Sequence, residues 1–132
     1  MVEGRASIKY EVVIGLISGK TNSVIYDHEY IKMKWQEYAK EFYDKTGVYV
    51  SAVAMVSHAI YNKEWGCPAL GEPCISFHCT ANPEFIKDFD VYGEGVLYIT
   101  KKLKKEYEQH TITITKIPAG VIYLTDKDNL ED

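Results

Sequence analysis

The sequence lacks the excess of basic residues that a nucleic-acid-binding protein usually carries. Its 15 lysine and arginine residues are outnumbered by 19 aspartate and glutamate residues, which gives a formal net charge of −4 at pH 7. This balance repels a phosphate backbone instead of attracting it. We therefore expect no nucleic acid among the partners of this protein.

Long apolar runs are also missing. No stretch approaches the ~20 apolar residues that a membrane-spanning helix needs. The first residues, MVEGRASIKYEVV, contain no apolar run of signal-peptide length before the first charges. We expect a cytoplasmic protein that does not associate with a membrane.

Cysteine is scarce, and the three thiols are Cys67, Cys74 and Cys79. An odd number of cysteines without a secretory signal favours reduced thiols, although Cys67 and Cys74 could meet at the mouth of a loop. His78 and Cys79 are adjacent in an expected strand, so they point to opposite faces and do not readily share a metal ion. We expect neither a metal site nor a cofactor.

The chain has the size and composition of one globular domain. Apolar residues make up 46% of its 132 positions and charged residues 26%, which are ordinary proportions. A chain of this length buries enough surface to fold without metals or disulfides. We expect a single domain over residues 1–132, with its core at 10–117 and flexible ends at 1–8 and 125–132.

Apolar periodicity and breaker residues predict several strands and two long helices. Asp27 is a suitable N-cap for the first helix, and Gly47 is a suitable stop. The expected elements are a strand at 10–18, a helix at 27–46, a strand at 48–61, a loop at 62–71, a strand at 72–80, a helical turn at 83–89, a helix at 95–109, a strand at 110–117 and an extra edge strand at 121–124.

The order β-α-β-β-α-β over residues 10–117 resembles the ferredoxin-like arrangement. This resemblance implies an α+β fold with a four-stranded antiparallel sheet of spatial order 4-1-3-2. It also implies that both helices cover one face of the sheet. The resemblance is one of topology, and such a fold hosts many unrelated activities, so it implies no function by itself.

The two strands of the hairpin at 48–80 alternate with opposite parity, and this assigns their side chains to faces. Val56, Phe77 and Cys79 are expected under the helices, whereas Met55 and His78 are expected on the open face. Matching the two apolar faces predicts a register that pairs Met55 with His78. A slip of two residues would keep the faces and change the pairs.

The open face is expected to carry little charge. A sheet face of hydroxyls, valine and methionine is better explained by a covering partner or ligand than by solvent. We expect a homo-oligomer formed through this face or through the hairpin at 48–80, and a small-molecule ligand is a further candidate. The ligand or interface residues we expect are Met55, Ser57, Thr80, Thr113, Tyr49, Tyr61 and Trp65.

His78 is the residue on this face most suited to chemistry. A histidine side chain can donate or accept a proton near neutral pH, and Ser76 and Glu11 are expected nearby. The alternative is a hydrogen-bonded histidine at an interface. The sequence does not decide between the two.

Three functional hypotheses remain open at this level. The first is a small homo-oligomer with a binding or accessory role on the open face. The second is an enzyme of the dimeric α+β barrel type in which His78 is the general acid or base. The third is a structural interaction module that uses the loop around Trp65.

Overall fold

The computed structural model describes residues 4–17 and 26–130. Within these ranges no helix is long and apolar enough to cross a membrane. The elements in chain order are β1 (Arg5–Gly15), α1 (His28–Thr46), β2 (Val53–Ala59), the 3-10 turn η1 (Lys63–Trp65), β3 (Glu72–Thr80), α2 (Phe89–Glu106) and β4 (Thr113–Val121).

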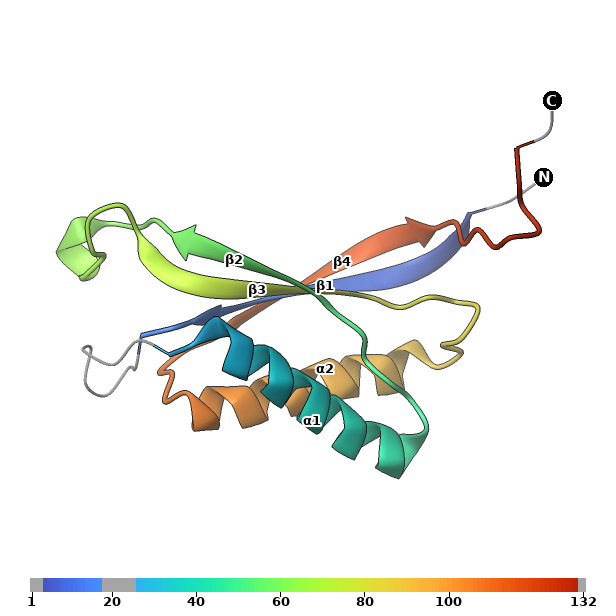
Figure 1. The fold of residues 1–132 in the computed structure, drawn as a ribbon, viewed down its shortest axis with the longest axis horizontal. Coiled ribbons are helices and arrows are strands. Elements are labelled where there is room, and N and C mark those ends of the chain that lie inside the picture. Colours follow the sequence, from blue (N-terminus) through green and yellow to red (C-terminus); the bar gives the residue numbers. More distant parts are fainter. Residues whose placement is uncertain (1–3, 18–25, 131–132) are drawn as a thin grey trace.

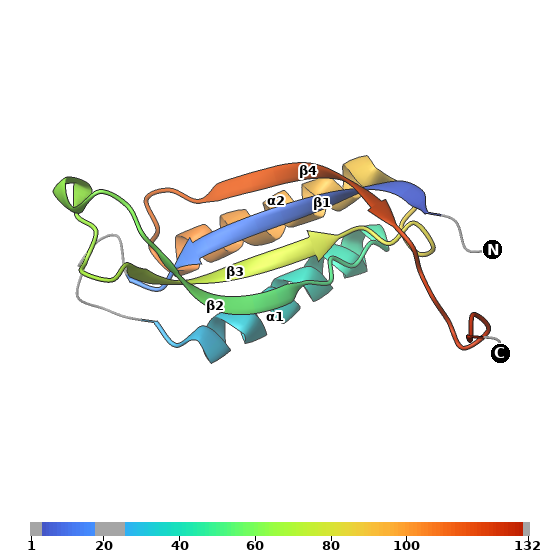
Figure 2. The same ribbon diagram turned by 90° about the horizontal axis from the view of Figure 1, so that it is seen from above.

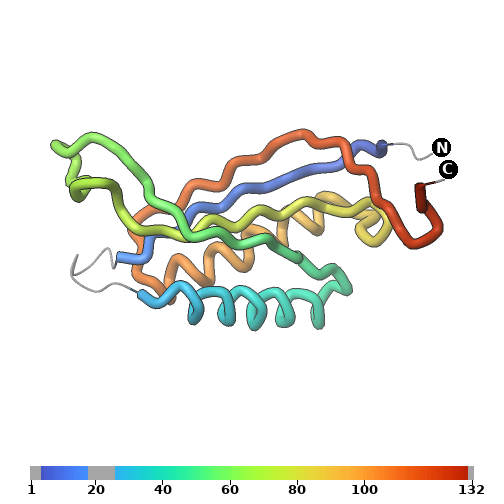
Figure 3. The backbone as a smooth tube through the Cα atoms, turned by 45° about the horizontal axis from the view of Figure 1, so that its top comes forward, coloured from blue at the N-terminus to red at the C-terminus, as the bar shows by residue number. Residues whose placement is uncertain are grey.

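The four strands form one antiparallel sheet in the order β2-β3-β1-β4. Both helices lie in a layer against one face of this sheet, and the opposite face is left open (Figure 1, Figure 3). The expected ferredoxin-like α+β arrangement is therefore confirmed, because 4-1-3-2 is the same order counted from the other edge.

The capping residues at both ends of α1 were predicted correctly from the sequence. The side chain of Asp27 accepts a hydrogen bond from the Glu29 amide at 2.9 Å, which satisfies one free donor of the first turn. At the other end Gly47 has φ 76°, a left-handed conformation that suits glycine, and its amide donates to the Tyr43 carbonyl. The predicted limits of this helix are confirmed.

The start of α2 was predicted wrongly. The helix begins at Phe89 and not at Gly95, because the Asp88 side chain accepts hydrogen bonds from two first-turn amides. Residues 83–85 form only a turn. Gly95 is a contact residue and not a helix breaker, since an added Cβ there would lie 2.8 Å from Phe42 Cε2 and Val50 Cγ2. It lets α2 approach α1 closely.

Strands β1 and β4 are longer than expected. β1 begins at Arg5, within the segment expected to be flexible, and residues 5–9 pair with the last part of β4. β4 itself continues through Pro118 to Val121, so no separate edge strand forms at 121–124. Proline is tolerated there because β4 is an edge strand, and the backbone N–H groups on the outer side of an edge strand have no neighbouring strand to pair with.

The hairpin register is shifted by two residues from the prediction. Val53, and not Met55, lies opposite His78, while Met55 lies opposite Ser76. The shift arises because β2 ends at Ala59, after which η1 and a tight turn at Gly71, with φ 100°, complete the connection. Since the shift is an even number, every side chain keeps its predicted face.

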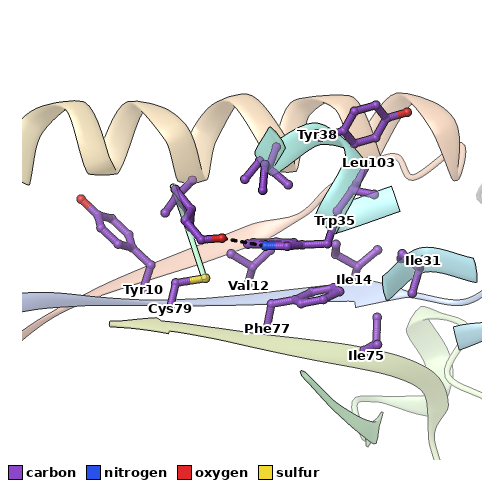
Figure 4. Packing of buried hydrophobic residues seen from close by; sticks show 14 of the residues in the cluster. Tyr10, Val12, Ile14, Ile31, Trp35, Tyr38, Ile75, Phe77, Cys79 and Leu103 are labelled. Atoms are coloured by element: carbon purple, nitrogen blue, oxygen red, sulfur yellow. Dashed lines mark hydrogen bonds between the residues drawn. The ribbon is translucent and has the colours of Figure 1, made fainter. Parts of the chain in front are cut away.

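The core lies between the sheet and the helices. Trp35 stacks on Phe77 with ring centroids 4.3 Å apart, and its indole N–H donates to the Val50 carbonyl at 3.1 Å (Figure 4). Cys79 is fully buried, as expected. Val56 is 50% exposed, contrary to prediction, because it lies on an edge strand that rises away from the helices (Figure 1).

Candidate functional site

The open face places His78 beside two charged side chains of β1. Glu11 and His78 are directly opposite in the β1–β3 pair, and His78 Nδ1 lies 3.4 Å from Glu11 Oε1. Lys9 Nζ lies 3.2 Å from the same carboxylate oxygen. The expected closeness of His78 and Glu11 is present, but the face carries more charge here than expected.

Ser76 does not bond to His78. Its hydroxyl lies 3.1 Å from the Ser57 hydroxyl, which in turn lies 3.2 Å from Cys74 Sγ. Ser57, Ser76 and Cys74 therefore form their own hydrogen-bonded cluster across β2 and β3. The three proposed catalytic residues do not form one constellation, since only His78 and Glu11 meet.

A hollow of about 470 Å³ opens at the opposite end of the same face. Three segments that are distant in sequence meet at this end of the sheet: the end of β1, the β2–β3 connection and the chain between α2 and β4 (Figure 2). The lining residues are Val13, Gly15, Ile17, Ala59, Tyr61, Trp65, Glu72, Cys74, Gln109, His110, Thr111, Ile112 and Thr113.

Glu72 is the carboxylate of this hollow, and Tyr61 holds it. The Tyr61 hydroxyl donates a hydrogen bond to Glu72 Oε2 at 3.2 Å. Desolvation raises the pKa of Tyr61, and the negative charge of Glu72 raises this pKa further. The phenol therefore stays protonated and keeps donating to the carboxylate at neutral pH. No lysine or arginine stands among the described lining residues, so the hollow favours positive charge.

The loop beside the hollow exposes Trp65, whose surface is 76% accessible. The nearby Cys67 sulfur accepts a hydrogen bond from the Tyr61 amide at 3.4 Å. Within the described part of the chain all three cysteines are free thiols. Because Trp65 lines the hollow and is still largely exposed, it borders the hollow without closing it.

Gln109 enters the hollow from the far end of α2. Its side-chain amide donates to the carbonyls of Ile17, at 2.9 Å, and Tyr107, at 3.0 Å. These two bonds fix the direction of the side chain. They also join the end of α2 to the end of β1.

The remaining predicted residues are spread along the sheet. Thr113 and Tyr61 line the hollow, whereas Met55 is 48% exposed in the middle of the open face. Tyr49 and Thr80 lie at the other end, where they line a second hollow of about 420 Å³. The seven ligand or interface candidates therefore do not belong to one site.

Sequence reasoning missed Glu72, Gln109 and His110 as site residues. Glu72 carried a usable signal, because any plausible hairpin register places this carboxylate close to Tyr61. Gln109 and His110 carried none, since they follow a helix in a segment with no motif. In residues 4–17 and 26–130, no cluster of three histidine, cysteine, aspartate or glutamate side chains could hold a metal ion.

Comparisons with known proteins give a consistent result. No curated protein matches the chain. A phage SAM lyase in the apo state superposes with a TM-score of 0.58 at 14% identity, covering 89% of this chain and 85% of the other. A phage SAM lyase in complex with S-methyl-5'-thioadenosine gives 0.52 at 12% identity, covering 89% and 90%. The SAM lyase family model matches residues 5–125, and the chain therefore belongs to the SAM lyase family.

Proposed function

We propose that this protein degrades S-adenosylmethionine and releases S-methyl-5'-thioadenosine. The observation that carries the proposal is the hollow that combines the Glu72 carboxylate with the rings of Tyr61 and Trp65. Aromatic rings suit a flat base and a sulfonium cation, and a carboxylate suits a ligand with positive charge. The hollow also has the volume typical of small-ligand sites. Membership of the SAM lyase family supports this choice of substrate.

The reaction breaks the bond between the sulfonium sulfur and the γ-carbon of the amino-acid chain. The bonding electron pair goes to sulfur, which becomes the neutral thioether of S-methyl-5'-thioadenosine. In one route an oxygen of the substrate's own carboxylate forms the new bond to the γ-carbon. This route gives a lactone and needs no external base. Alternatively, a base removes a proton from the β-carbon and leaves an unsaturated amino acid. Neither route consumes water.

The residues of the hollow contribute to this step by holding the substrate. The positive charge on sulfur disappears as the bond breaks, so a carboxylate pressed against sulfur would favour the substrate over the transition state. Glu72 therefore helps more by holding the amino-acid end, while Tyr61 and Trp65 contact the adenosine part. When the amino-acid part of the bound substrate is held in a bent conformation, its carboxylate oxygen lies close to the γ-carbon.

The test is direct product analysis. Purified protein is incubated with S-adenosylmethionine, and the mixture is resolved by chromatography with mass spectrometry. We expect S-methyl-5'-thioadenosine and a lactone in equal amounts. Heat-denatured protein is the control, because a sulfonium can lose its thioether without a catalyst. Depletion no faster than this control, or S-adenosylhomocysteine as the product, would refute the proposal.

His78 and Glu11 remain the alternative acid–base pair, since their side chains meet at 3.4 Å. Neither residue lines the 470 Å³ hollow, so this alternative requires a substrate that extends along the open face. It predicts an unsaturated amino acid and not a lactone. It also predicts that His78→Ala abolishes turnover while Tyr61→Phe does not.

We also propose self-association through the open face or the hairpin loop. Val13, Val53 and Met55 are exposed on the face, and Ile60 and Leu70 are exposed beside Trp65. A group of exposed apolar side chains on one surface supports a role of that surface in binding a partner. Light scattering at several protein concentrations measures the mass, and a monomer at the highest concentration would refute the proposal.

A further inference from the structure

The second hollow, of about 420 Å³, is built from aromatic rings and uncharged polar groups. It lies where the end of α1, the end of β3 and the start of α2 come together (Figure 1, Figure 2). The aromatic members of its lining are Tyr43, Tyr49, Phe85 and Tyr92. No described lining residue is an acid, a base or a histidine. The hollow therefore suits a neutral molecule, because a charge would lose its hydration there without gaining an opposite charge.

Tyr92 supplies a buried hydroxyl that has no acceptor in the described part of the protein. This residue of α2 is only 1% exposed, yet it lines the hollow. Within residues 4–17 and 26–130 its hydroxyl has no hydrogen-bond partner. Burial raises the pKa of Tyr92, so the phenol keeps its proton and remains a donor. A buried donor without an acceptor costs free energy, and a ligand that brings an acceptor removes this cost.

Asn82 adds a second donor to the lining of the same hollow. Its side-chain oxygen accepts a hydrogen bond from the Glu84 amide at 2.9 Å. This bond identifies the oxygen end of the side chain, so the other end is the NH₂ group. No acceptor in the described ranges is hydrogen-bonded to that nitrogen. Two donors from different segments thus border the hollow, and they favour a ligand with several acceptors.

The other three rings give the hollow apolar walls. Tyr43 and Tyr49 form an edge-to-face pair, with ring centroids 6.1 Å apart and 69° between the ring planes. The Phe85 side chain is 67% exposed although it lines the hollow. A flat aromatic ligand would cover this apolar surface, and aromatic rings pack favourably against one another in stacked or edge-to-face arrangements. The walls therefore favour a planar ring over a flexible chain.

We propose that the second hollow binds a neutral, planar heteroaromatic molecule with hydrogen-bond acceptors, of the kind that nucleobases contain. The Tyr92 hydroxyl and the Asn82 NH₂ group donate to its ring nitrogens or carbonyl oxygens, and Phe85 contacts its ring. An aliphatic ligand would leave the Tyr92 hydroxyl without an acceptor. The site is independent of the substrate proposed for the first hollow, since the two hollows share no lining residue within the described chain.

Caffeine is a suitable probe, because it is neutral and planar and carries carbonyl oxygens and a ring nitrogen but no N–H group. Indole is the matched control ligand, since it has a flat ring and an N–H group but no acceptor. Two-dimensional NMR follows the backbone amides while each ligand is added, and the shifts give the Kd. We expect caffeine to cause saturable shifts at Gly47 and Asn82, which line the second hollow, whereas Gly15 and Cys74 report on the first.

Three variants test the proposed contacts. Tyr92→Phe removes only the hydroxyl, so it should raise the Kd for caffeine at least about fivefold and change the Kd for indole less than about twofold. Tyr98→Phe is the matched control, because Tyr98 lies on the same helix and donates to Glu41 at 2.8 Å outside the hollow. It should bind caffeine like the wild type. Phe85→Ala should weaken both ligands about two- to tenfold.

Several results would overturn the proposal. Caffeine shifts confined to Gly15 and Cys74, or no saturable shifts up to the solubility limit of caffeine, would show that the second hollow is not such a site. An unchanged Kd for caffeine in Tyr92→Phe would mean that the hydroxyl meets only water. If Tyr92→Phe alters the fold, Phe85→Ala decides, and wild-type binding of caffeine by that variant overturns the proposal. Turnover of S-adenosylmethionine enters none of these measurements, so a failure of the proposed function remains distinguishable.

Discussion

Replacing Val12 and Val56 separately by alanine measures how far the helices cover the sheet. Both valines lie on the helix-facing side of a strand, and alternation predicts that both are buried. In the structure Val12 is 0% exposed on a central strand, whereas Val56 is 50% exposed on the edge strand β2. The pair therefore compares one residue type in two environments.

The expected losses follow from burial. Removing two buried methyl groups costs about 1.6 kcal/mol of transfer free energy, and the cavity left behind raises the loss for Val12→Ala to about 2–3 kcal/mol. Val56→Ala should cost only about 0.5–1 kcal/mol, because half of the side chain is already in water. The lower strand propensity of alanine affects both variants in the same direction.

Thermal unfolding followed by circular dichroism measures both losses. For a chain of this length we expect a melting temperature lowered by roughly 6–15 °C for Val12→Ala and by less than about 5 °C for Val56→Ala. Native far-ultraviolet spectra of both variants are the control for folding. Equal losses would refute the reasoning, since they would mean that β2 is as well covered in solution as β1.

Three further predictions concern the site, the core and a helix end. Glu72→Gln should lower kcat/KM for S-adenosylmethionine about 10- to 100-fold by removing the negative charge of the hollow, whereas Glu64→Gln in the exposed turn η1 should not; equal activity of both variants would contradict the role of the charge. Burial raises the pKa of Cys79 from its ordinary 9.0 to about 12. The neutral thiol therefore contributes its full stability below pH 9. This stability is lost as the pH rises toward 12, at up to about 1.4 kcal/mol per pH unit. Unfolding free energies measured across this range should fall less steeply for Cys79→Ala, and parallel curves would contradict this. Asp88→Ala should cost about 0.5–2 kcal/mol, because two first-turn amides lose their acceptor; a silent substitution in thermal unfolding would mean that α2 begins later in the chain.

The candidate site was predictable only in part. Tyr61, Trp65 and Thr113 were expected to contact a ligand, and they line the 470 Å³ hollow. His78 and Glu11 were expected to be close, and they are, but they lie outside that hollow. A rule based on strand alternation finds residues on a face, and it does not say where along the face the surface is concave.

Sequence reasoning missed residues that reach the site only because segments distant in the sequence lie side by side in the fold. Gln109 contacts Ile17 across 92 positions of sequence, and no local pattern at either residue indicates this contact. Gly15 looked like an ordinary strand residue, and only the fold shows that a Cβ added there would lie 2.7 Å from Gln109 Oε1. The start of α2 was missed because Gly93 and Gly95 resemble helix breakers in isolation.

By itself, the sequence determined the α+β class, the strand order, the limits of α1 and the face on which each strand residue lies. These properties follow from alternation, helix capping and the handedness of crossovers, which are local or nearly local rules. Only the tertiary structure decided the hairpin register, the exposure of Val56 and the grouping of Glu72 with Gly15 and Gln109. These depend on how the turn after Ala59 closes and on how far the helices extend over the sheet, and both are set by packing between segments that lie far apart in the chain.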